Sequence, residues 1–199
     1  TRKESSAASD VYKRQMADST EYPALEADIP VITSEGKSNV KIAGVKSKNK
    51  LVRYTIPETL LRADENFLAL MVEAEKYIGY PYVYGGSKPS TGFDCSGFVC
   101  WVFRQSGVYD TGRLGAKGLY SLCTDVSRDE ARPGDLVFFT KTMGADVKGI
   151  THVGIYVGNN MMLHAGDPVG FADLQSDKWA KKIYAFGRLP VQQGAQANE

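Results

Sequence analysis

The sequence has little excess charge, few histidines and cysteines, and no long hydrophobic run, and each shortage excludes a class of protein. Its 199 residues hold 24 Lys and Arg against 23 Asp and Glu, a formal net charge of +1. No basic field therefore indicates a nucleic-acid partner or an anionic membrane surface. No apolar run reaches the roughly 20 residues that cross a bilayer, so no membrane segment is expected.

Cysteine and histidine are too scarce and too scattered for a metal centre. Cys95, Cys100 and Cys123 are an odd number without CxxC spacing, which argues against a disulfide framework and a structural zinc site. The chain has only two histidines, His152 and His164. Together with one cysteine they would give three metal ligands, and the sequence offers no fourth ligand and no closely spaced ligand pair. We therefore expect no metal and no other cofactor. Nothing in the composition indicates an oligomeric state.

The first 63 residues are not expected to carry the fold. Residues 5–15 (SSAASDVYKRQ) resemble the translation of a sequencing adaptor, so residues 1–15 are expected to be an adaptor-derived or disordered tail. A native signal or anchor would then lie upstream of Met16. Residues 16–63 are polar, with prolines and a lysine-rich patch, which is typical of a linker. Short apolar runs within them, such as 29–32 and 51–56, could dock as strands.

Residues 64–190 have the patterns of one α+β domain, and 191–199 are expected to be a disordered tail. Helical spacing of apolar residues predicts three helices, over 64–78, 95–107 and 113–123, with Asp64 as the N-cap of the first. Runs of β-type residues predict four later strands, at 136–139, 152–157, 161–165 and 183–189. Helices followed by hairpin-linked strands favour an antiparallel sheet.

Cys95 follows a glycine-rich loop and begins the second predicted helix, with Asp94 at the N-cap position. A helix start gathers unpaired N–H groups and the positive end of the helix dipole, and both favour a thiolate. The pattern predicts a nucleophilic cysteine that is alkylated ahead of the other two at mildly acidic pH. The alternative is a small buried residue, the interpretation that we prefer for Cys100 and Cys123.

The two histidines occupy paired strands of a predicted hairpin that turns at 158–160, so their side chains should project from one region of the sheet. A thiolate needs an imidazole to take its proton, and the imidazole needs a polar group to fix its tautomer. Cys95, His152 and His164 would fill these roles in that order. A purely structural histidine is the alternative, and other polar side chains could orient His152 equally well.

Five motifs, in order, resemble those of the NlpC/P60 family of papain-like cysteine peptidases. They are YVYGG at 82–86, FDCSGF at 93–98, RPGDLVF at 132–138, HVGIYV at 152–157 and HA at 164–165. The resemblance covers 65–190 and implies a papain-like fold with N-terminal helices packed on a central antiparallel sheet. It also implies hydrolysis of peptidoglycan stem peptides, most often between D-γ-glutamyl and diaminopimelate or lysine, outside the cell or at its wall.

The resemblance implies that Cys95 is the nucleophile, His152 the general base and acid, and His164 the orienting residue. Tyr82 is implied to help stabilise the oxyanion. Two alternatives stay open: a papain-like amidase, deamidase or acyltransferase on another substrate, and a catalytically silent wall-binding module. Retention of all three proposed catalytic residues favours an enzyme.

The remaining implications concern substrate binding. Asp94 and Ser96 match residues that recognise a free N-terminal L-alanine in family members acting on short stems, although helix capping alone would explain Asp94. Tyr84 stands where the family commonly has tryptophan, a difference that concerns packing or specificity. Residues 112–120 and 161–167 further resemble the C-terminal peptidase domains of mobile-element proteins from Gram-positive bacteria.

Overall fold

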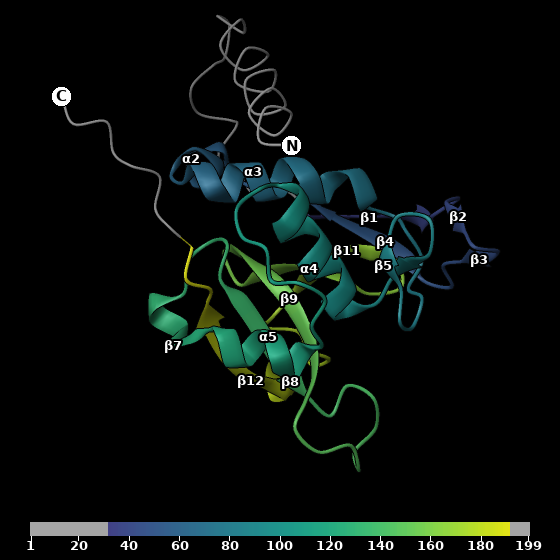
Figure 1. The fold of residues 1–199 in the computed structure, drawn as a ribbon. Coiled ribbons are helices and arrows are strands. Elements are labelled where there is room, and N and C mark those ends of the chain that lie inside the picture. The colour runs from purple at the N-terminus through teal and green to yellow at the C-terminus, as the bar shows by residue number, and fades with distance from the viewer. Residues whose placement is uncertain (1–31, 192–199) are drawn as a thin grey trace, which may run out of the picture.

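The computed structural model describes residues 32–191, in which a twisted antiparallel sheet has its main helices on one face (Figure 1). The strand order is β11-β10-β9-β8-β12-β7, and every neighbouring pair is antiparallel. The strands are β7 (Thr124–Val126), β8 (Leu136–Thr140), β9 (Ile150–Gly158), β10 (Met161–Ala165), β11 (Val169–Asp173) and β12 (Ile183–Arg188). The predicted α+β class with an antiparallel sheet is confirmed.

The helices are those that the apolar spacing predicts, with one short addition. They are α2 (Glu58–Arg62), α3 (Glu65–Ala74), α4 (Cys95–Gln105) and α5 (Ala116–Leu122), and α3 continues into a 3₁₀ turn, Glu75–Tyr77. Asp64 caps α3 as predicted, because its carboxylate accepts a hydrogen bond of 3.0 Å from the N–H of Phe67. Further 3₁₀ turns lie at Arg128–Glu130 and Ala180–Lys182.

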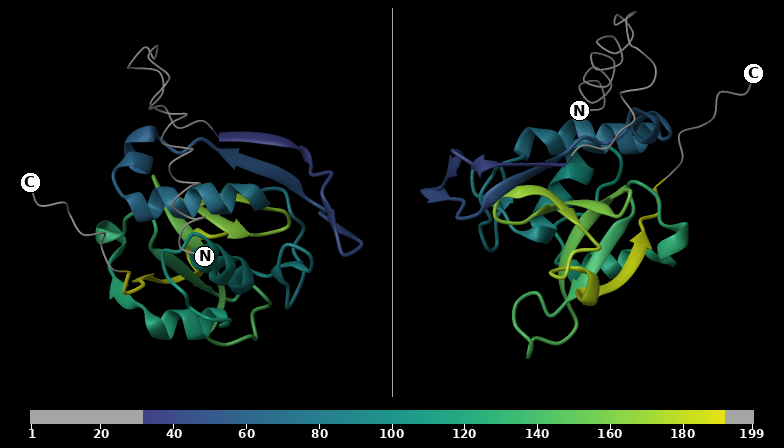
Figure 2. Two further views of the ribbon diagram at one scale, coloured as in Figure 1. Left: turned by 45° about the horizontal axis from the view of Figure 1, so that its top comes forward. Right: turned by 180° about the vertical axis from the view of Figure 1, so that it is seen from behind.

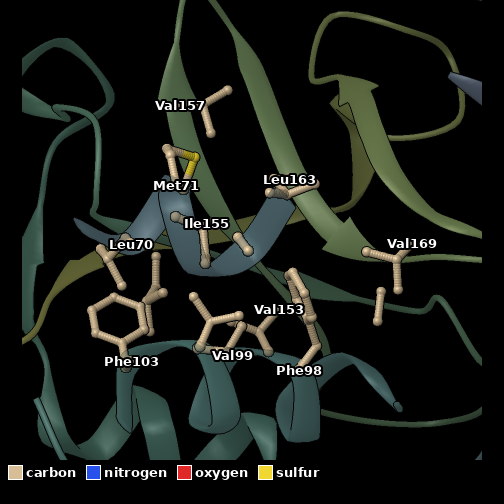
Figure 3. Close-up of a cluster of buried hydrophobic side chains, with 14 of the residues drawn as sticks. Leu70, Met71, Phe98, Val99, Phe103, Val153, Ile155, Val157, Leu163 and Val169 are labelled. Carbon is tan, nitrogen blue, oxygen red and sulfur yellow. The ribbon is translucent and has the colours of Figure 1, made fainter. Parts of the chain in front are cut away.

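The core fills the space between the helices and the sheet. Side chains of β9 alternate, so that Val153, Ile155 and Val157 face the helices while His152 faces the other side. Figure 3 shows these valines and isoleucine meeting helix side chains from α3 and α4, namely Leu70, Met71, Phe98, Val99 and Phe103. A smaller cluster covers the opposite face: Val137, Phe139, Met162, Leu174, Trp179 and Phe186. The sheet is therefore buried on both sides.

The N-terminal segment that the structure describes differs from the linker expected over 16–63. Strands β1 (Ile32–Lys37) and β4 (Lys50–Tyr54) pair with each other, and β4 lies beside β11 (Figure 2). Tyr54 packs edge to face on Phe171 of β11, with ring centroids 5.7 Å apart. The apolar run at 51–56 thus docks as anticipated, and burial of its side chains outweighs the polar, lysine-rich composition around it.

Smaller elements complete the chain. A hairpin of β2 (Lys41–Ile42) and β3 (Val45–Lys46) projects from the body (Figure 1), and β5 (Ser87–Lys88) pairs with β6 (Gly92–Phe93) just before α4. Strands β7 and β11 were not predicted, because β7 has only three residues, two of them polar, and β11 contains a glycine and ends in a polar residue. Residues 1–31 and 192–199, including the adaptor-like stretch, lie outside the described residues.

Among the described residues, none of the helices has both the length and the apolar character needed to cross a membrane.

Candidate active site

Cys95 is the first residue of α4, and the loop before the helix holds it in place. Asp94 is the N-cap, and its Oδ1 accepts a hydrogen bond of 2.6 Å from the N–H of Gly97. A Cβ atom on Gly97 would lie 2.1 Å from the carbonyl oxygen of Gly86, so only glycine allows the loop to approach the first turn this closely. The side chain of Cys95 is consequently fixed and largely buried, with 8% exposed.

The hairpin of β9 and β10 brings the two histidines together, as the sequence predicts. Nε2 of His152 and Nδ1 of His164 are 2.9 Å apart, a hydrogen bond between two buried rings. Because Leu163 pairs with Ile155, the two histidines are diagonal neighbours rather than directly opposite. The bond occupies one nitrogen of each imidazole and leaves Nδ1 of His152 available to another group.

Cys95 lies against the strand that carries His152. The backbone N–H groups of Val153, the residue after His152, of Ser96 and of Cys95 itself lie close enough to the Cys95 sulfur to favour its anionic form. The thiol is therefore held between the start of α4 and the beginning of β9. The sulfur therefore lies beside the residue that follows His152, and the catalytic roles of Cys95, His152 and His164 stay a prediction.

Trp179 is part of this region, and sequence reasoning missed it. Its ring stacks on the imidazole of His152, with centroids 5.2 Å apart and an interplanar angle of 27°. It also meets His164 edge to face at 5.0 Å, and the ammonium of Lys178 lies 5.1 Å from its centre. The signal that the sequence offered was a single large aromatic residue in an otherwise polar stretch, SDKWAKK at 176–182. The indole shields both imidazoles from water.

Burial determines the resting protonation state. It raises the pKa of Cys95 to about 11, with a further contribution from the charge of Asp94, and the three backbone N–H donors only partly offset this rise. Burial lowers the pKa of His152 to about 3, helped by the nearby Lys178 charge, and it also holds the pKa of His164 well below 6.5. The resting pair is a thiol with a neutral imidazole.

The expectation of a thiolate at the helix start is therefore wrong for the free protein. Desolvation of the buried sulfur outweighs the helix-terminal N–H groups that favour the anion. Slow alkylation of Cys95 at mildly acidic pH is the expected behaviour instead.

Tyr82 lies near the thiol and keeps its proton. Its side chain is half-buried, and burial raises the pKa of its phenol, followed by the charges of Cys95 and Asp94. A protonated hydroxyl close to the sulfur is a hydrogen-bond donor. Tyr84, two residues further along, is 79% exposed and contributes an open aromatic surface beside this loop.

Asp94 and Ser96 are both engaged by Arg113, a residue that sequence reasoning did not assign to the site. Nη2 of Arg113 donates to Oδ2 of Asp94 at 2.8 Å, and Nη1 donates to Oγ of Ser96 at 3.0 Å. Asp94 also accepts from Ser96 and from the N–H of Gly85, at 3.1 Å each. An ammonium group could reach this carboxylate only by displacing the guanidinium. The 112–120 stretch had been singled out, but not for this arginine.

No group of three or more His, Cys, Asp or Glu side chains within residues 32–191 is placed to hold a metal ion. The site residues instead offer a thiol, two imidazoles and several hydrogen-bond donors. Such a set suits nucleophilic attack followed by proton transfer.

Comparisons with known proteins identify the family of the chain. The model of the NlpC/P60 family matches residues 79–188, more than half of the chain. The bifunctional muramidase/DL-endopeptidase CwlT of Bacillus subtilis is 46% identical over 121 residues, which are 60% of this chain and 36% of that protein. The gamma-DL-glutamyl hydrolase of the same species is 41% identical over 120 residues, 59% of this chain and 28% of the relative.

A solved structure agrees. An NLP/P60 family protein from Staphylococcus aureus, described as similar to lipoprotein, superimposes with a TM-score of 0.59 at 42% identity. The match covers 63% of this chain and 42% of that one. The chain thus spans only about a third of the length of the curated relatives that it matches. The matched segment contains the site, the sheet and α4, and the chain belongs to the NlpC/P60 family.

Proposed function

We propose that this protein is a cysteine endopeptidase that cleaves peptidoglycan stem peptides at the bond following D-γ-glutamate. The observation that carries the proposal is one arrangement of three side chains. Cys95 begins α4 and lies near the backbone N–H of Val153, the residue after His152, and His152 is hydrogen-bonded to His164 at 2.9 Å. A thiol, a base and an orienting group are the parts that nucleophilic amide hydrolysis needs.

In the proposed mechanism the substrate triggers proton transfer. Its entry displaces water from the site, and His152 takes the thiol proton as the Cys95 sulfur attacks the amide carbonyl. The hydroxyl of Tyr82 and the N–H of Cys95 stabilise the oxyanion. Collapse of the tetrahedral intermediate breaks the C–N bond, and His152 returns its proton to the leaving amine.

The second half of the cycle releases the acyl product. A water molecule gives a proton to His152 and attacks the thioester, and the departing sulfur is reprotonated as the peptide acid leaves. His164 keeps the His152 ring in one orientation through both steps, and Trp179 supports it by stacking. The neutral histidines suit this role, because a base must start without the proton.

Names of the relatives support the choice of substrate. One is named a DL-endopeptidase and the other a gamma-DL-glutamyl hydrolase. Applied to this chain, they favour a γ-linked D,L bond, found in the stem peptides of bacterial cell wall. The place of action would then be outside the cell or at the wall.

A comparison of the full chain with its Cys95→Ala variant tests the proposal. Both proteins are incubated with defined muropeptides that differ in the third stem residue, and products are identified by mass spectrometry. We expect the wild type to release fragments ending in D-γ-glutamate and the variant to release none. Equal product from both proteins would overturn the mechanism. Binding to muropeptides without cleavage would instead support a wall-binding module, and deamidated products would support a related amidase.

A further inference from the structure

The guanidinium of Arg113 lies next to the proposed nucleophile, and only some of its N–H groups donate hydrogen bonds to the residues that the structure describes. Nη1 of Arg113 donates to Ser96 and Nη2 donates to Asp94, the two residues that flank Cys95. The other N–H of Nη1 donates to the carbonyl oxygen of Leu114. Among residues 32–191, the hydrogen bonds found for Arg113 therefore start twice from Nη1 and once from Nη2, and none of them starts from Nε.

This leaves a pair of parallel donors. A guanidinium has five N–H groups in one plane, and Nε–H and the outer Nη2–H form a fork that matches the two oxygens of a carboxylate. The Arg113 side chain is 41% exposed, so a ligand can reach it. Its contacts with Asp94 and Ser96 hold the plane of the group, which reduces the entropy lost on binding.

We propose that Arg113 determines specificity by binding the free α-carboxylate of the substrate's γ-linked glutamate through this fork. The inference rests on the proposed function, because it names which part of that substrate the site recognises. In a γ-glutamyl peptide the carbonyl attacked by Cys95 and the α-carboxylate are joined by a short aliphatic chain. The spacing suits a guanidinium anchored to both sequence neighbours of the nucleophile.

The charged groups around the site are of both signs. The guanidinium is offset by Asp94, and Lys178 adds a second cation near the histidines. Lys178 is the competing candidate for the same carboxylate, since its ammonium lies over Trp179 beside His152. The two side chains differ in position. Arg113 contacts Asp94 and Ser96 at the start of α4, whereas Lys178 lies over Trp179, which stacks on His152.

The test compares two synthetic stem peptides, one with a free α-carboxylate on γ-linked D-glutamate and its α-carboxamide twin. For each enzyme form the measured quantity is the ratio of kcat/KM for the acid to that for the amide. We expect the wild type to favour the acid by about 10- to 100-fold, as for a bidentate charged pair. In Arg113→Met the ratio should fall close to one. Using a ratio cancels any general effect of an unpaired Asp94 on Cys95.

Controls separate the alternatives. Arg104 is a second exposed, ion-paired arginine; it lies near the end of α4 and contacts Asp110 at 3.5 Å. The Arg104→Met variant should leave the ratio unchanged. Lys178→Met should also leave it unchanged; if it abolishes the preference instead, the proposal is wrong. If Arg113→Met does not fold, Arg113→Gln, which can still donate to Asp94, replaces it.

The outcomes also distinguish this inference from the proposed function. Hydrolysis of both peptides at equal rates by the wild type, or a preference that survives in the Arg113 variant, would overturn the inference alone. Hydrolysis of neither peptide by the wild type would remove the proposed function and the inference with it.

Discussion

At the scale of single residues, burial decides how the site behaves before substrate arrives. Cys95 and His152 both sit where the charged form is disfavoured, so neither carries a charge at neutral pH. The sequence predicts which residues meet, because the histidines share a hairpin and the cysteine begins a helix. It does not predict their pKa values, since these depend on packing around them from distant parts of the chain.

The neutral, buried histidines make stability depend on acid. The pKa of His152 is lowered from 6.5 to about 3 in the folded state, so the unfolded chain binds a proton more readily between these values. The stabilising contribution is therefore complete above pH 6.5 and declines as the pH falls toward the folded value. We expect His152 to account for a loss of about 2 kcal/mol in unfolding free energy between neutral pH and about pH 5.

Urea titrations of the wild type and His152→Gln at several pH values measure this contribution. The variant lacks the titrating ring. Acidification should therefore lower its unfolding free energy less than it lowers that of the wild type, and the difference should equal the His152 contribution. Identical pH dependence in both proteins would show that His152 is not held neutral by the fold.

At the scale of elements, the start of α4 and the loop before it act as one unit. The sequence predicts the helix, its Asp94 cap and a glycine-rich loop, all of which the structure contains. It does not predict that Gly97 and Gly86 touch, or that Arg113 and Trp179 join the site. Those contacts depend on how distant segments pack, and no local spacing encodes them.

The contact between Gly97 and Gly86 predicts an unusual result for a helix substitution. Alanine normally stabilises a helix interior relative to glycine by about 1 kcal/mol. At position 97 the added Cβ would instead collide with the Gly86 carbonyl, so we expect Gly97→Ala to destabilise by about 1 to 3 kcal/mol and to reduce activity.

Chemical denaturation and peptide hydrolysis provide the two measurements for this variant. Gly36→Ala in β1 is the matched control, because no atom lies within 4 Å of its added Cβ, and its stability should stay within about 0.5 kcal/mol of the wild type. A Gly97→Ala protein as stable and active as the control would contradict the tight loop contact.

At the scale of the whole molecule, the folded body begins earlier than the sequence indicates. The boundary expected at residue 64 follows a change in composition, whereas Leu51, Tyr54 and Ile56 are buried against the rest of the structure. Tyr54 also accepts a hydrogen bond of 3.0 Å from Asn159 in the turn between β9 and β10. Amino-acid composition reflects the structure that a segment prefers on its own. It does not reveal that the few apolar side chains of a polar segment pack against a strand far away in the sequence, as those of β4 do against β11.

Two truncations test whether this segment is part of the folding unit. Removal of residues 1–31, which lie outside the described residues, gives the reference protein for the second truncation. Removal of residues 1–63 deletes several buried side chains worth roughly 1.5 to 3 kcal/mol each, so we expect a loss of about 4 kcal/mol or more. Denaturation curves compare the three proteins, and equal midpoints for the full chain and the longer truncation would support the boundary at residue 64.

The fold class and the family follow from motifs that the sequence displays directly, such as FDCSGF and HVGIYV. The resemblance to mobile-element proteins stays a prediction, as do the substrate-binding roles of Asp94, Ser96 and Tyr84. Arg113 donates hydrogen bonds to both Asp94 and Ser96, and the proposal made for this arginine assigns it a substrate carboxylate.

The central claim is that the Cys95 sulfur becomes acylated during turnover, and acid quenching tests it most directly. Wild type and Cys95→Ala are mixed with a stem peptide, quenched early in turnover, digested and mapped by mass spectrometry. We predict a γ-glutamyl acyl group on the wild-type peptide that contains Cys95, and neither acylation nor product in the variant. Acylation of Cys100 or Cys123, or turnover that persists without Cys95, would contradict the account.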